Sequence, residues 1–143
     1  MLYLLDTNVL SEPSKLNPDR SVTTWADEQP RDALAVSAVS LGEVRYGIEL
    51  LEHGARRARL ERWLKVSILD HFHGRVLSVT KHVALKWAHL AAAGQRRGRP
   101  LDMADGLLLA TAAVHGLTIV TRNERDFEGR GVPVHNPWRT GND

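Results

Sequence analysis

The chain contains no cysteine, so it can form neither a disulfide nor a thiolate metal site, and nothing indicates an oxidising compartment. It also lacks a long apolar run, because no stretch approaches the roughly 20 apolar residues that a membrane-spanning helix needs. The apolar segment at the N-terminus is five residues long, has no basic region before it and ends in an aspartate, unlike a signal peptide. We therefore expect a soluble, cytoplasmic protein with no membrane partner.

Several common catalytic motifs are missing as well. The sequence has no GxGxxG, no phosphate-binding lysine loop and no GxSxG, which removes the usual signals of nucleotide binding and of serine hydrolases. Its seven histidines are scattered without the HExxH spacing of zinc proteases. The candidate chemistry therefore has to come from acidic residues.

The order of apolar and amphipathic segments indicates the fold. We interpret residues 1–143 as one domain, in which short strand patterns are separated by helical ones. The expected strands cover residues 2–6, 33–37, 75–79, 117–121 and 132–134, and the expected helices 7–12, 19–29, 40–51, 55–69, 80–93 and 102–115. This alternation predicts an α/β protein, a three-layer α/β/α sandwich with a small parallel sheet.

Asp6 directly follows an apolar strand, so its carboxylate should lie at the carboxyl end of that strand. Ligands of open α/β sheets bind at this edge. A buried carboxylate there needs a cation or hydrogen-bond donors. The alternative is that Asp6 only caps the following helix, as aspartate often does.

Two further acids lie at helix starts. Glu43 can close a capping box with Ser40, or it can point across the sheet edge and share a cation with Asp6. Asp105 follows Asp102, a plausible N-cap, by three residues and opens a very apolar helix that should sink into the core. We therefore expect Asp105 to face inward at the sheet edge, where an unpaired charge is costly.

Arginine dominates the basic residues: all but four of the 19 are arginine, although the net charge is only +2. One cluster consists of Arg96, Arg97 and Arg99. Arginine binds phosphate bidentately and stacks on bases, so this cluster is a candidate RNA-binding surface. A solvated helix face is the other interpretation.

Four ordered segments together resemble the PIN domain, and in particular the VapC-type toxins of bacterial type II toxin–antitoxin pairs. The similarity lies in the string LLDTNVLSEP at residues 4–13, SxxExxYG at 40–47, DxxDG at 102–106 followed by ATA at 110–112, and TRN at 121–123. The closing NPW at 136–138 also fits. The resemblance runs through nearly the whole chain.

The resemblance implies a ribonuclease that uses Mg²⁺ or Mn²⁺. Asp6, Glu43 and Asp105 match the first three acidic positions of the family and would be its metal ligands. A bound cation would activate a water to attack the phosphodiester. Glu43 or Asp126 could act as the base, and the products would carry a 5′-phosphate and a 3′-hydroxyl.

The sequence departs from the family at the fourth acidic position. Asn123 stands where many members have aspartate, which puts a second metal site in doubt. Asp126 or Asp102 could supply the missing charge. Thr121 matches a position that supports the acidic cluster by hydrogen bonding, and we expect Asn8 and Asn123 to support it too.

The family also implies partners. These are RNA, a small antitoxin that lies across the active-site groove, and a second copy of the chain in a homodimer. Apolar helical surfaces around Trp63 and Trp87 fit a dimer, although both residues could simply belong to the core. Two alternatives remain: a degenerate PIN module that binds RNA or a protein without cleaving, and a haloacid-dehalogenase-like phosphohydrolase.

Overall fold

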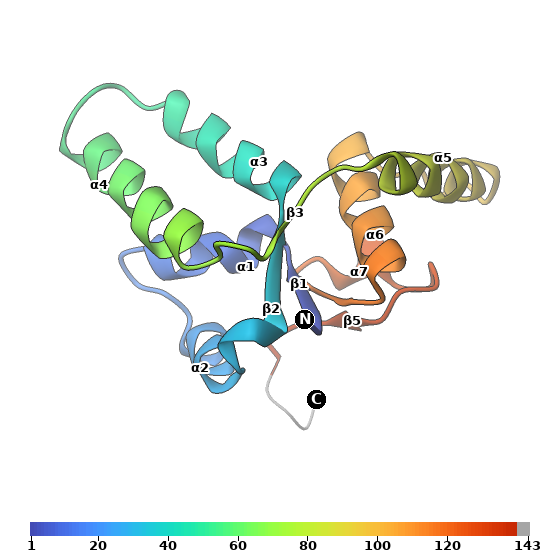
Figure 1. The fold of residues 1–143 in the computed structure, drawn as a ribbon, viewed down its shortest axis with the longest axis horizontal. Coiled ribbons are helices and arrows are strands. Elements are labelled where there is room, and N and C mark those ends of the chain that lie inside the picture. Colours follow the sequence, from blue (N-terminus) through green and yellow to red (C-terminus); the bar gives the residue numbers. More distant parts are fainter. Residues whose placement is uncertain (140–143) are drawn as a thin grey trace.

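The computed structural model describes residues 1–139 (Figure 1). Its strands are β1 (Tyr3–Leu5), β2 (Leu34–Ser37), β3 (Val76–Leu77), β4 (Thr118–Val120) and β5 (Val134–His135). Its α-helices are α1 (Thr7–Ser11), α2 (Arg20–Glu28), α3 (Ala38–Glu49), α4 (Ala55–Trp63), α5 (Lys81–Arg96), α6 (Met103–His115) and α7 (Glu124–Phe127). Short 3₁₀ turns cover Glu12–Ser14 and Arg31–Ala33, and a π-helical segment, Leu64–Asp70, continues α4.

The five strands form one parallel sheet in the order β3-β2-β1-β4-β5. β1 lies at the centre, where Leu5 pairs with Val36 of β2 and with Val120 of β4. The strand order reverses between β1 and β4, because the chain builds outward from β1 first on one side and then on the other. In open α/β sheets ligands bind at the carboxyl ends of the strands that flank such a reversal.

Alternating strand residues supply the cores on the two faces of the sheet. Leu5, Val36 and Val120 face the side covered by α1, α2, α3 and the π-helical segment. Leu4 and Ile119 face the other side, against the apolar residues of α6. Figure 1 shows α1 to α4 on one side of the strands and α5 to α7 on the other. The predicted three-layer α/β/α sandwich is confirmed.

The start of α3 differs from the prediction, and the difference matters for the site. The helix begins at Ala38, because the Ser37 side chain accepts a hydrogen bond from the amide of Val39 and caps it. Ser40 is therefore a buried residue of the first turn rather than the N-cap. The capping box between Ser40 and Glu43 is wrong, which leaves the Glu43 carboxylate available for other contacts.

The predicted end of α5 at Gly94 is also wrong, because the helix continues to Arg96. Gly94 has a packing role: a Cβ atom there would lie 2.7 Å from the carbonyl oxygen of Arg99 and 2.9 Å from Nη1 of Arg130. The helix ends instead before Gly98, whose φ of +71° suits glycine. Glycine at residue 94 thus allows the following turn to fold back onto the helix.

Other boundaries differ by a few residues. The predicted strands are longer than the observed ones, and the fifth lies at Val134–His135 rather than at residues 132–134. The predicted helix 55–69 is helical throughout, but its last part has π-type hydrogen bonding. The predicted N-caps Thr80 and Asp102 are confirmed, since each accepts a backbone amide hydrogen bond at the start of α5 and α6. Asp19, which was predicted to lie inside a helix, is instead the N-cap of α2.

Candidate active site

Asp6 lies at the reversal of strand order, directly after β1, and is only 7% exposed. Its Oδ1 accepts a hydrogen bond from the amide of Thr7 at 2.7 Å. Its Oδ2 accepts one from the Thr121 hydroxyl at 2.7 Å and one from Nδ2 of Asn8 at 3.3 Å. Burial raises the pKa of Asp6 although these three hydrogen bonds act to lower it. Asp6 therefore caps α1 and also presents a carboxylate at the sheet edge.

Thr121 follows β4 and is fully buried. Besides donating to Asp6, its hydroxyl oxygen accepts a hydrogen bond from the amide of Asn123 at 3.0 Å. The amide of Arg122 donates to Oδ1 of Asn8 at 3.3 Å. The turn after β4 is thus joined to the turn after β1 by two side chains. The structure brings the predicted supporting residues Thr121 and Asn8 to the Asp6 carboxylate, while the side chain of Asn123 is exposed.

Glu43 lies on α3 and is exposed. Its Oε1 accepts a hydrogen bond from the Thr7 hydroxyl at 2.8 Å. Thr7 donates through its amide to Asp6 as well, so one residue joins the two acids. The alternative in which Glu43 points toward the sheet edge is therefore the one that the structure shows.

Asp105 is the residue whose pKa the other acids of the site raise. It lies half-buried in the first turn of α6, where its amide donates to Oδ1 of Asp102 at 2.8 Å. Burial, followed by the charges of the neighbouring carboxylates, raises the pKa of Asp105 to about 6; in decreasing order these carboxylates are Asp102, Asp6, Asp126 and Glu43. Carboxylates from four separate chain segments thus act on this one side chain.

Asp126 lies exposed on α7, and its backbone is held by a residue that the sequence analysis missed. Arg130 is buried, and its Nε donates to the carbonyl of Asp126 at 2.7 Å while its Nη1 donates to the carbonyl of Arg99 at 3.0 Å. The sequence does contain a sign of this role, because Arg130 lies between Gly129 and Gly131. Both glycines have positive φ in the structure. Two glycines around one arginine allow the chain to turn that guanidinium inward.

The predicted RNA-binding arginines have different environments. Arg96 and Arg97 are exposed at the end of α5. The guanidinium of Arg99 donates to the carbonyls of Arg125 and Glu128 at 2.9 and 3.0 Å, so it anchors the turn after α5 to α7. This places the exposed pair next to the segment that carries Asp126.

The donor set is suited to a hard divalent cation, because every candidate ligand offers carboxylate oxygen. Repulsion between the carboxylates helps to raise the pKa of Asp105, and a bound cation would reduce that repulsion. Within residues 1–139, however, no group of three or more His, Cys, Asp or Glu side chains is close enough to enclose an ion as it stands. Magnesium or manganese therefore fits the chemistry of these residues and remains a prediction.

No helix in the described part of the chain is both long and apolar enough to cross a membrane.

Comparison with known proteins gives a consistent picture. The family model of the PIN domain matches residues 3–131. The VapC ribonuclease Y4jK of Sinorhizobium fredii is 36% identical over 137 residues, which cover 96% of this chain and 98% of that protein. Toxin FitB of Neisseria gonorrhoeae is 37% identical over 137 residues, covering 96% and 99%. A solved structure of FitAB bound to an IR36 DNA fragment superposes with a TM-score of 0.92 at 36% identity and covers 96% of each chain.

Proposed function

Because the chain belongs to the PIN-domain family, we propose that it is a metal-dependent endoribonuclease and the toxin of a type II toxin–antitoxin pair. The observation that carries this proposal is the convergence of carboxylates on Asp105 at the reversal of strand order. Two similar proteins of nearly equal length are a VapC ribonuclease and a toxin, which supports the same reading. The haloacid-dehalogenase-like alternative is set aside, since the matching family is a different one.

Asp6, Glu43 and Asp105 would hold Mg²⁺ or Mn²⁺. When bound, such a cation lowers the pKa of a coordinated water and stabilises negative charge on the phosphate oxygens. The chain's own contribution is to fix the first ligand: Thr121 and Thr7 hold both oxygens of Asp6 by short hydrogen bonds. A buried, hydrogen-bonded carboxylate keeps its position when the charge around it changes.

Of the exposed acids near Asp105, Asp102 is occupied as the N-cap of α6, and Glu43 and Asp126 are the candidates for the general base. The base takes a proton from the attacking water, whose oxygen forms a bond to phosphorus as the bond from phosphorus to the 3′ oxygen breaks. The leaving oxygen gains a proton, so the products carry a 5′-phosphate and a 3′-hydroxyl. Recovery of cyclic phosphate or 3′-phosphate ends would exclude this mechanism.

RNA must approach an acidic centre that repels it, so cationic side chains have to lie beside that centre. Arg96 and Arg97 are exposed next to α7 and can bind the backbone, whereas Arg99 keeps that surface in place. We expect Arg96→Gln/Arg97→Gln to weaken cleavage and to reduce its dependence on salt. The matched control is Arg56→Gln/Arg62→Gln, which removes two exposed charges from α4 on the other side of the sheet.

An antitoxin and a second copy of the chain are the protein partners that we propose. The antitoxin is supported by the likeness to FitAB. A dimer is supported by exposed apolar residues on α5 and α6, among them Leu85 at 70% and Met103 at 61%. Light scattering of the purified chain tests the dimer, and Leu85→Lys should convert it to a monomer.

The decisive experiment compares wild type and Asp105→Asn in cleavage of end-labelled transfer and ribosomal RNA. Each is assayed without antitoxin in Mg²⁺, in Mn²⁺ and in EDTA. The proposal expects cutting that requires the metal and disappears in the variant. RNA binding without any cutting would favour the degenerate module instead, and cutting that survives the variant would indicate a contaminating nuclease.

A further inference from the structure

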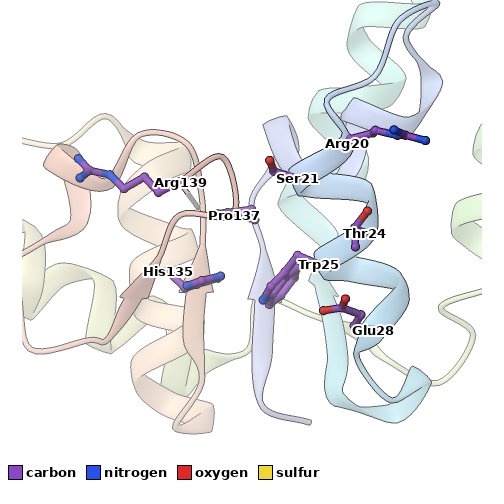
Figure 2. A pocket seen from close by; sticks show the side chains of 8 residues that line it. All are labelled: Arg20, Ser21, Thr24, Trp25, Glu28, His135, Pro137 and Arg139. Carbon is purple, nitrogen blue, oxygen red and sulfur yellow. The ribbon is translucent and has the colours of Figure 1, made fainter. Parts of the chain in front are cut away.

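A pocket of about 490 Å³ lies between α2 and the segment around β5 (Figure 2). Trp25 of α2 and His135 of β5 point toward each other and pack together in its wall, beside the buried Pro137. The Trp25 and His135 rings have centroids 5.1 Å apart and planes inclined at 36°. The volume lies in the range of small-ligand sites, and ring faces are the surfaces on which bases stack.

One residue that lines the pocket, His135, has a polar atom that lacks a partner. Nε2 of His135 is buried and makes no hydrogen bond within the described residues. Burial lowers the pKa of His135, although Glu124 acts to raise it, so the imidazole is neutral near pH 7 and has one donor and one acceptor nitrogen. A buried polar atom without a partner costs free energy. Because this nitrogen is covered, a ligand with hydrogen-bonding groups on its edge would reach it only after the imidazole turns toward the pocket.

The charged residues of the lining are Arg20, Arg139 and Glu28. Both arginines are exposed, and Figure 2 shows their side chains directed away from the rings of Trp25 and His135. Arg139 pairs with Glu124 and also lines a neighbouring cavity of about 440 Å³ that includes Asn123 and Asp126. Arg139 thus lines both cavities, and the second one is also lined by Asp126, one of the acids that act on Asp105.

The sheet fixes how far the pocket lies from that centre. His135 pairs with Val120, the residue before Thr121, and β5 is two strands away from β1. Two strand spacings are about 10 Å. A nucleic-acid strand with one phosphate at Asp6 could therefore place a neighbouring nucleotide over the pocket.

We propose that this pocket binds an unpaired nucleobase of the RNA substrate, with Arg20 and Arg139 on the adjoining phosphates. The inference rests on the proposed ribonuclease function. Thr24 and Glu28 line the same face of α2 and offer hydroxyl and carboxylate groups to the edge of the base. Arg139 already pairs with Glu124, so an apolar side chain of a protein partner would leave the charge of Arg20 without a counter-charge from the ligand, and a nucleobase with its phosphate is the occupant that the chemistry favours.

The test measures binding of labelled single-stranded oligoribonucleotides that differ at one position. The protein is the full chain with Asp105→Asn, without divalent metal, so that binding is read independently of cleavage. Trp25→Leu is compared with Trp63→Leu, since Trp63 is also half-buried against the same core. Urea unfolding of both variants shows whether they lose similar stability.

We expect Trp25→Leu to weaken binding by at least about 5-fold, the lower end for loss of one stacked base, and to flatten the preference at one RNA position. Glu28→Gln should change which base is preferred, and Trp63→Leu should change neither property. The proposal is overturned if Trp25→Leu binds like the parent protein, if Trp63→Leu has the same effect, or if no RNA binds.

Two outcomes separate this proposal from the proposed function. Absence of Asp105-dependent cleavage in otherwise wild-type protein counts against the ribonuclease, while the binding comparison still reports on the pocket. Conversely, metal-dependent cleavage with unchanged RNA binding in Trp25→Leu refutes the pocket alone. If Trp25→Leu weakens only the complex with a co-expressed antitoxin, the pocket holds a protein segment and the proposal is wrong.

Discussion

Replacing Asp105 by asparagine should stabilise the metal-free protein while it abolishes cleavage. The folded chain holds Asp105 where burial and four other carboxylates raise its pKa to about 6 from an ordinary 3.8. That difference corresponds to at most about 3 kcal/mol against folding at neutral pH. Because the side chain is partly exposed and screened by solvent, we expect about 1 kcal/mol. Asparagine keeps the shape and removes the charge.

The stability difference between Asp105→Asn and wild type should depend on pH in a definite direction. Below pH 3.8 Asp105 is protonated in both the folded and the unfolded chain, so the variant has no advantage from this source. As the pH rises from 3.8 to about 6, the unfolded chain loses the proton first, and the free energy of unfolding of wild type falls relative to that of the variant. Above that range the advantage of the variant is complete.

Urea unfolding in EDTA at several pH values between 4 and 8 measures the effect. Asp102→Asn is the matched control, since asparagine also caps helices and the change removes the first-ranked of the repelling charges. It should shift stability in the same direction by a smaller amount. The reasoning would be refuted if Asp105→Asn were less stable than wild type at pH 7. It would also be refuted if the difference in free energy of unfolding between the two proteins were the same at every pH. Added Mg²⁺ should stabilise wild type selectively.

Three further changes probe the scaffold. Thr121→Val removes the buried hydroxyl that donates to Asp6 and should cost about 1.5–3 kcal/mol in urea unfolding at pH 7, whereas Thr121→Ser should cost less. Gly106→Ala brings a Cβ atom within 2.7 Å of the Trp87 indole and should cost about 1–3 kcal/mol, seen as a lower Tm. Thr80→Ala removes the N-cap of α5 and should cost about 1 kcal/mol, measured by urea unfolding.

For each of these three predictions, one result would contradict the structural argument. Equal losses for the valine and serine variants would show that the hydroxyl hydrogen bond is unimportant. The control for Gly106 is Gly47→Ala, where a Cβ atom meets nothing within 4 Å, so an equal loss there would contradict the packing argument. Full stability without the threonine cap would mean that tertiary packing alone sets the start of α5.

The sequence was most informative where one local rule acted alone. An apolar run followed by a charged residue located the carboxyl end of β1 and hence Asp6, because a buried parallel strand is apolar on both faces. The cap at Asp102 followed from the preference of aspartate for helix starts. Such rules depend only on neighbours in the chain.

Prediction failed where distant residues decided the local structure. Ser37 and Ser40 are both suitable N-caps, and the register of β2 in the sheet selects the first. Gly94 looks like a helix end, yet it is required because the backbone of Arg99 packs against it. The inward turn of Arg130 likewise depends on carbonyl groups that only the folded chain brings together.

The hydrogen bond between Thr121 and Asp6 joins residues that are 115 positions apart in the chain. β1 is synthesised long before β4, its second neighbour in the sheet. While the ribosome is still making the protein, the emerging chain therefore has the first acid without its buried hydrogen-bond donor, and for most of that time without Asp105. We therefore expect a chain that terminates before β4 to lack the assembled acidic site.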